Sequence, residues 1–151
     1  MKRTDFSVDW LFAACAPDTE LLPWNAQFTP VDLPHDWQIR HADDLYRDGT
    51  LFYRKYFFVT DVPGTRRMLW FGGAYMDTTV FVNGTEVGQW KYGYTSFWFD
   101  ITDALHEGQN EVLVRCNLRH PNSRWYSGAG LYRNVELWEA ADLHLMPDGL
   151  Y

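Results

Sequence analysis

The chain has 151 residues, a formal net charge of −7 at neutral pH and an aromatic content of 18%, with eight Trp, nine Tyr and ten Phe. A length near 150 predicts one compact domain, and the thirteen Lys and Arg residues are scattered, which argues against a nucleic-acid partner. Neutral or polar small molecules are the expected ligands. Cys15 and Cys116 are too few for a disulfide framework, so we expect free thiols.

The first fifty residues are interrupted by prolines and contain only short apolar runs, so we expect loops and edge strands that wrap the domain. Asp5 and Asp9 break the run of about 7–15 apolar residues that a signal peptide needs. No stretch approaches the ~20 apolar residues of a membrane span. These features predict a cytoplasmic protein without membrane association.

From Leu51 onward, short strand-like runs alternate with turns. The runs at 51–59 and 66–73 are rich in strand formers and are separated by a turn that contains Pro63 and Gly64. Two further runs within 76–90 meet at Asn83-Gly84, the dipeptide most typical of a type I′ hairpin. The same residues match an N-glycosylation acceptor, but the turn is a sufficient explanation.

The second half continues the same pattern. A strand is expected at 95–102, a single helical turn at 103–107, and a last long strand at 131–140. In the run at 111–116, Val112, Val114 and Cys116 alternate with polar residues and should face the core. The sequence therefore predicts an all-β domain, and short strands at regular spacing favour a β-sandwich jelly roll of about eight strands.

Motifs for catalytic chemistry are missing from this sequence. The five His and two Cys show no ligand spacing such as HExxH or CxxC, so no metal is expected. No GxSxG elbow marks a nucleophile, and no Gly-rich loop of the dinucleotide or phosphate type is present, so no cofactor is expected.

Three segments resemble the N-terminal domain of glycoside hydrolase family 2, which contains β-galactosidases, β-glucuronidases and β-mannosidases. They are VDLPHDWQI at 31–39, YMDTTVFVNGTEVGQWKYGYTSFWFDIT at 75–102 and PNSRWYSGAGLYRNVELW at 121–138. The resemblance implies a galactose-binding-like jelly roll and covers nearly the whole chain. It also draws attention to Asn110-Glu111, because this family carries its acid/base on an Asn-Glu dipeptide, but here Glu111 begins a strand and is expected to be non-catalytic.

The resemblance further implies an immunoglobulin-like domain and a (β/α)₈ barrel that bears both catalytic glutamates. Such a barrel takes about 250 residues, so we expect this chain to be part of a longer polypeptide. We assign 1–145 to the sandwich and 146–151 to the start of a linker. A homo-oligomer of the full-length protein is left open.

The implied function is a non-catalytic carbohydrate-binding and scaffold domain that helps to complete the active site of the barrel. The HDW and SRWYSGAGLYR segments favour the β-galactosidase branch and a β-galactoside substrate. Two alternatives stay open: a free-standing carbohydrate-binding module, and a purely structural interface domain.

The candidate substrate-binding residues lie in two of these segments. Asp36 is expected either to accept sugar hydroxyls or to stabilise its loop as an Asx turn, and it lies between the candidates His35 and Trp37. Arg124, Trp125 and Tyr126 are expected either to form a sugar platform or to pack against the other domains. A separate group of aromatic residues is expected to be a structural patch: Trp90, Tyr92 and Tyr94.

Overall fold

A computed structural model describes residues 1–40, 43–44, 46–60, 63–121 and 127–144. Within these ranges the chain forms ten strands and two short 3₁₀-helices. The strands are β1 (Lys2–Asp5), β2 (Trp10–Cys15), β3 (Thr29–Val31), β4 (Gly49–Val59), β5 (Thr65–Phe71), β6 (Thr78–Val82), β7 (Thr85–Trp90), β8 (Phe97–Asp100), β9 (Gly108–Leu118) and β10 (Val135–Ala141). The helices are η1 (Gln38–Arg40) and η2 (Thr102–Ala104).

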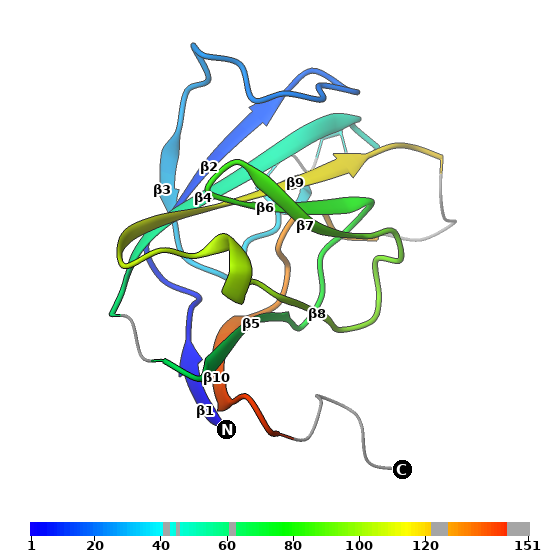
Figure 1. Ribbon diagram of the computed structural model, residues 1–151. Helices are drawn as coiled ribbons and strands as arrows, with labels where there is room; N and C mark the ends of the chain where they lie inside the picture. The colour runs from blue at the N-terminus through cyan, green and yellow to red at the C-terminus, as the bar shows by residue number, and fades with distance from the viewer. Residues whose placement is uncertain (41–42, 45, 61–62, 122–126, 145–151) are drawn as a thin grey trace.

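The strands form two antiparallel sheets, which Figure 1 shows as separate layers. One sheet has the order β1-β10-β5-β8, and the other has the order β3-β2-β4-β9-β6-β7. The longest pairing joins β4 to β9 over eleven residue pairs, from Gly49↔Leu118 to Val59↔Gly108. Non-consecutive strands are neighbours in both sheets, so the arrangement is a sandwich with crossovers, and the predicted all-β sandwich is confirmed.

The main core lies between the two sheets. Val112, Val114 and Cys116 of β9 are completely buried, as their alternation predicted. From the opposite sheet, β5 contributes Leu69 and Phe71, which are also completely buried in the same cluster. Cys15 and Cys116 are free thiols.

The predicted hairpin is present between β6 and β7. Val82 pairs with Thr85, so Asn83 and Gly84 form a two-residue loop. Their φ values are 49° and 80°, and two positive φ values at these positions are the requirement of a type I′ turn. The Asn83 side chain also donates to the carbonyl of Ala104 at 2.8 Å, which ties the turn to η2.

The expectation for the first fifty residues was wrong in one respect. β1 and β3 are edge strands, but β2 lies between β3 and β4 inside the six-stranded sheet. Trp10 of β2 is completely buried and donates its indole N–H to the carbonyl of Phe6 at 2.7 Å. The short run of β2 is therefore part of the core, because β3 and β4 flank it on both sides within the sheet.

A second, smaller hydrophobic cluster covers the outer face of the four-stranded sheet. It consists of Met68, Trp138 and Ala140, with Trp70 and Trp98 packed against it. The guanidinium carbon of Arg3 lies 4.2 Å from the ring centre of Trp138, so β1 contributes a cation–π contact to the same face.

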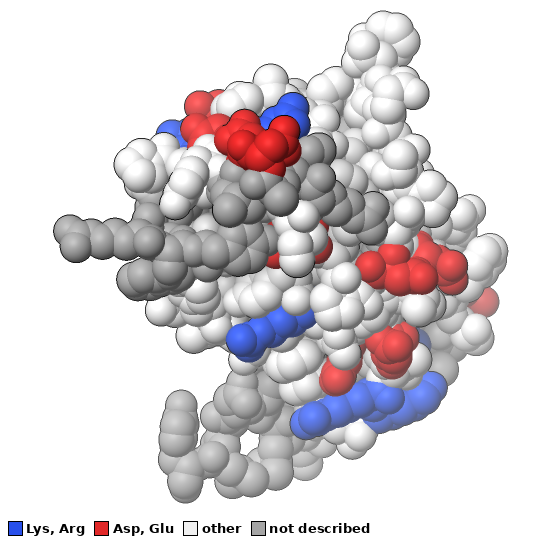
Figure 2. Space-filling view, turned by 180° about the vertical axis from the view of Figure 1, so that it is seen from behind, with Lys and Arg blue, Asp and Glu red and all other residues white. Residues whose placement is uncertain are grey.

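Charged side chains are distributed over the surface. On the face shown in Figure 2, Lys and Arg lie singly or beside Asp and Glu, with wide uncharged areas between them. The ion pairs include Arg67 with Glu139 at 3.2 Å and Arg54 with Glu111 at 3.2 Å.

Candidate functional site

The loop that carries His35, Asp36 and Trp37 follows β3 and lies against the segment 127–131. The amide of His35 donates to the carbonyl of Leu131 at 2.8 Å, and the amide of Trp37 donates to the carbonyl of Ala129 at 3.1 Å. Two of the segments that carry the family resemblance therefore meet in space. Arg124, Trp125 and Tyr126, the other candidates, lie outside the described residues.

His35 and Trp37 are anchors of this loop, because both are buried. His35 Nδ1 shares a 2.8 Å hydrogen bond with the hydroxyl of Tyr53, whose ring is completely buried in the core. Burial raises the pKa of Tyr53 well above its ordinary value, so this hydroxyl stays protonated at neutral pH. Trp37 packs against Gly49, where an added Cβ would lie 3.2 Å from the indole.

Asp36, between these two anchors, is partly exposed. Its Oδ1 accepts the amide N–H of Gln38 at 3.0 Å, which is the Asx turn anticipated from the sequence. Its Oδ2 faces the backbone of Gly128, because a Cβ added there would lie 3.4 Å from this oxygen. The anchors thus hold one carboxylate between the HDW loop and the segment 127–131.

Tyrosine side chains border the same segment on its other side. Tyr75 and Gly130 exchange backbone hydrogen bonds of 2.9 and 2.8 Å, which brings the chain after β5 against the segment. The ring of Tyr94 lies 5.3 Å from that of Tyr75, and the hydroxyl of Tyr132 donates to the carbonyl of Gly93 at 2.7 Å. Burial raises the pKa of Tyr75 and of Tyr132.

Sequence reasoning missed Tyr75 and Tyr132, although two glycines carried a signal. A Cβ on Gly93 would overlap the ring of Tyr75, and a Cβ on Gly130 would overlap the hydroxyl of Tyr53. Only glycine permits so close an approach.

The predicted aromatic patch has structural contacts. Trp90 stacks on Phe97 with the ring centres 5.7 Å apart, and its indole N–H donates to the hydroxyl of Thr95 at 3.2 Å. The ring of Tyr92 lies 5.7 Å from that of Tyr94, so the patch continues into the tyrosines beside Gly130. All three side chains are also partly exposed, at 37%, 58% and 37% for Trp90, Tyr92 and Tyr94.

Glu111 lies on β9, as expected, and is paired with Arg54 at 3.2 Å between Nε and Oε2. This position is on an interior strand of the sheet, between β4 and β6. Among the described residues, no group of three or more His, Cys, Asp or Glu side chains is arranged to hold a metal ion. None of the helices in these ranges is long and apolar enough to cross a membrane.

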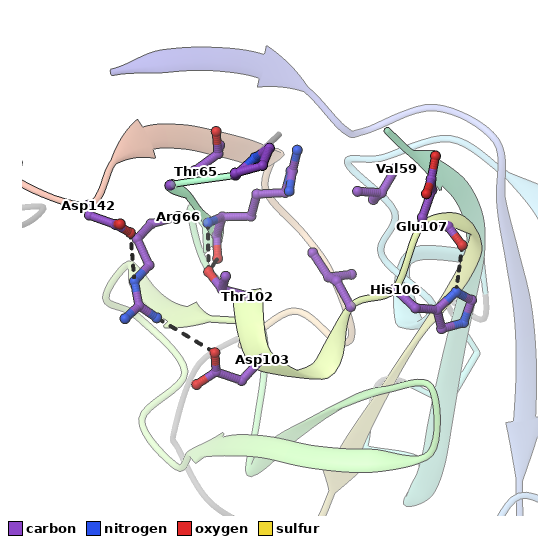
Figure 3. A pocket seen from close by; sticks show the side chains of 12 residues that line it. Val59, Thr65, Arg66, Thr102, Asp103, His106, Glu107 and Asp142 are labelled. Carbon is purple, nitrogen blue, oxygen red and sulfur yellow. Dashed lines mark hydrogen bonds and ion pairs between the residues drawn. The ribbon is translucent and has the colours of Figure 1, made fainter. Parts of the chain in front are cut away.

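A cavity of about 440 Å³ lies at the far end of β4, near Val59, and Figure 3 shows its lining. Arg66 pairs there with Asp103 at 3.8 Å and with Asp142 at 3.6 Å. The HDW loop packs against Gly49, the first residue of β4. Eleven residues of strand separate the two places by roughly 33 Å, so this cavity is not part of the Asp36 site.

The fold and the loop geometry define a β-sandwich that holds a carboxylate-bearing loop at one end. Residues 23–141 match the family described as glycosyl hydrolases family 2, sugar binding domain. The chain belongs to this family, as the sequence motifs predicted.

Individual relatives agree with this assignment. The chain is 37% identical to a β-galactosidase, BoGH2A, of Bacteroides ovatus, over 99% of this chain and 19% of that protein. It is 35% identical to a β-glucuronidase of Bacteroides fragilis over 62% of this chain and 15% of that protein. The crystal structure of a glycosyl hydrolase family 2 member from Bacteroides cellulosilyticus superimposes with a TM-score of 0.78 at 28% identity, over 93% of this chain and 21% of that chain. The chain thus spans about a fifth of the length of these relatives.

Proposed function

We propose that this chain is the non-catalytic, N-terminal sugar-binding domain of a retaining β-glycosidase that acts on β-galactosides. In this proposal the HDW loop reaches the active site of a (β/α)₈ barrel elsewhere in the polypeptide, with an immunoglobulin-like domain between them. Asp36 accepts hydroxyl groups of the sugar, and its neighbours hold the loop in place.

The observation that carries the proposal is the way Asp36 is held. Its two neighbours are buried, and two backbone hydrogen bonds of 2.8 and 3.1 Å fasten the loop to the segment 129–131. A binding carboxylate is effective when its loop is fixed before the ligand arrives, because little conformational entropy is then lost on binding. Asp36 itself keeps some exposure, so it can meet a ligand while its loop stays in place.

The choice of a β-galactoside rests on the HDW and SRWYSGAGLYR segments, which favour the β-galactosidase branch. The comparisons include both substrate classes: the β-galactosidase of Bacteroides ovatus matches 99% of this chain at 37% identity, and a putative β-glucuronidase of Formosa agariphila matches 99% at 34% identity. The glycone is therefore the part of the proposal that a comparison of substrates should test first.

The test uses the complete polypeptide that carries this chain, assayed with p-nitrophenyl β-galactoside and p-nitrophenyl β-glucuronide. We expect Asp36→Ala to lower kcat/KM for the galactoside by about 100-fold, because lost hydroxyl contacts in glycosidase transition states cost several kcal/mol. Asp36→Asn removes the negative charge and keeps the Asx turn, since an Asn oxygen can still accept the amide N–H of Gln38. This variant should keep the melting temperature and lose most of the activity.

Asp32→Ala is the matched control. Asp32 is exposed and its Oδ1 accepts the amide of Asp9 at 2.9 Å, so it is also a loop carboxylate bonded to the backbone. We expect this variant to retain activity. A lower melting temperature for Asp36→Ala with an unchanged kcat/KM would instead assign Asp36 a purely structural role. Micromolar galactose binding by the chain alone would favour a free-standing carbohydrate-binding module.

A further inference from the structure

The outer face of the four-stranded sheet contains a cavity of about 450 Å³, lined by parts of β5 and β10 and by the connection that precedes β10. This volume falls within the range of about 300–1,000 Å³ that is typical of small-molecule sites. Its lining includes Trp70, Tyr132, Arg133 and Glu136, and it includes neither Asp36 nor Gly128. We call it the Trp70 pocket.

Gly72 lies on the floor of the Trp70 pocket, in close contact with two other residues of the lining. A Cβ added there would lie 3.1 Å from the Cβ of Arg133 and 3.3 Å from Cη2 of Trp70. The backbone at this point is fixed, because the amide of Gly72 donates to the carbonyl of Asn134 at 2.9 Å. Any other residue at this position would therefore push Arg133 or Trp70 aside and change the shape of the pocket.

One side of the pocket is a flat aromatic surface. Trp70 is partly exposed, and its ring is stacked on that of Trp138 with the centres 5.7 Å apart and an angle of 9° between the planes. Trp98 pairs with Trp70 across the neighbouring strand. Packing among these rings restricts the indole of Trp70 to one orientation, so the surface exists before a ligand binds.

Two charged groups of opposite sign complete the lining. Oε2 of Glu136 accepts the indole N–H of Trp138 at 2.6 Å, and its other oxygen has no hydrogen bond among the described residues. The guanidinium of Arg133 lies 5.4 Å from the ring centre of Tyr132, and its Nη1 donates to the carbonyl of Gly72 at 3.4 Å. Glu136 is held by one contact and Arg133 by two, and each side chain keeps capacity for further hydrogen bonds.

We propose that the Trp70 pocket binds a neutral hexopyranoside unit, at a site separate from Asp36. One face of a pyranose presents C–H groups that can lie on the Trp70 ring, while its hydroxyls can donate to Glu136 and accept from Arg133. The carboxylate and the guanidinium cancel in charge, which favours a neutral sugar over a uronate. The site lies close to the HDW loop, since Pro34 also lines the pocket.

NMR titration of the ¹⁵N-labelled chain with methyl β-galactoside tests the proposal. We expect saturable shifts of the Trp70 indole N–H and the Gly72 amide, with a Kd in the millimolar range, which about −4 kcal/mol of binding free energy provides. Glu136→Gln should weaken binding about fivefold, because a charged acceptor is stronger than a neutral one. Gly72→Val should abolish the shifts, because its side chain would displace Arg133 and Trp70 from their positions in the pocket lining.

Asp32→Ala is the control, because Asp32 does not line the pocket, and it should bind methyl β-galactoside with unchanged affinity in this assay. Thermal unfolding of each variant confirms that it is folded before titration. The proposal is overturned if the shifts do not saturate, if glycerol produces the same shifts at equal concentration, or if glucuronate binds more tightly than the galactoside. It is also overturned if Asp36→Asn abolishes the shifts and Gly72→Val retains them.

Discussion

Gly130 should be the glycine whose replacement damages the loop site most. Its φ is +87°, a conformation that costs a side-chain-bearing residue about 1–2 kcal/mol. A Cβ there would also overlap the hydroxyl of Tyr53, which is completely buried and bonded to His35. To relieve this overlap, the Tyr53 ring must move and break its hydrogen bond to His35. Overpacking of about 1–3 kcal/mol and a buried unpaired group of about 1–3 kcal/mol bring the expected total for Gly130→Ala to about 3–8 kcal/mol.

Gly84→Ala is the matched control, because Gly84 has a φ of +80° and no atom lies within 4 Å of an added Cβ. It carries the same backbone strain without the steric overlap, so it should cost about 1–2 kcal/mol. Urea unfolding followed by tryptophan fluorescence measures both values. At about 2–4 °C per kcal/mol for a chain of this size, Gly130→Ala should melt at least about 4 °C below Gly84→Ala.

A double substitution tests whether overlap with the Tyr53 hydroxyl causes the loss of stability. In Gly130→Ala combined with Tyr53→Phe, the overlapping hydroxyl is absent, so the loss of stability should be smaller than the sum of the two single losses. The reasoning is refuted if the two alanine variants differ by less than about 0.5 kcal/mol, or if the double variant shows simple additivity.

The remaining predictions concern thiols, pH and activity. Burial raises the pKa of Cys116 to about 12 and raises that of Cys15 above its ordinary value. A thiol reagent at pH 8 should therefore leave Cys116 unmodified in the folded chain. In urea, the same reagent should label both cysteines. The pKa of the Tyr53 hydroxyl is higher in the folded than in the unfolded state, so the unfolded state loses this proton first as pH rises. The free energy of unfolding should therefore fall above about pH 10. In urea titrations at several pH values, Tyr53→Phe should show a shallower fall. The 151-residue chain alone should not hydrolyse p-nitrophenyl β-galactoside, and turnover that disappears when one of its own acidic residues is replaced would contradict this.

The parts of the fold that sequence reasoning predicted depend on local chemistry. Asn83-Gly84 determines its turn by itself, because its positive φ values suit few other residues. The alternation in β9 likewise assigned the buried face from neighbouring positions. By contrast, the last strand was expected at 131–140 but begins at Val135, because Leu131 accepts the amide of His35 and so belongs to the loop site. That contact joins residues 96 positions apart, which no local pattern encodes.

In the candidate site, too, local sequence predicted some features, and contacts between residues distant in sequence determine the others. The motif HDW identified the loop, and the structure adds that Asp36 forms an Asx turn and faces Gly128. The Trp70 pocket could not be anticipated, because it depends on β5, β10 and the residue Pro34 meeting in space. Its only local trace is Gly72, and a glycine at a strand end has many ordinary explanations.

The loop that carries Asp36 and the core that stabilises the fold share Tyr53. Its ring lies 5.0 Å from that of Phe12 within the sandwich, and its hydroxyl meets His35 of the loop. Phe12 in turn lies 4.6 Å from the imidazole of His35, so the core ring contacts the loop directly as well. A substitution that loosens this part of the core must therefore also loosen the position of Asp36, because interiors at close-packed density transmit displacement instead of absorbing it. Loss of function after a core substitution here is consequently weak evidence for a direct contact with sugar, and only variants that preserve the Asx turn, such as Asp36→Asn, isolate the carboxylate itself.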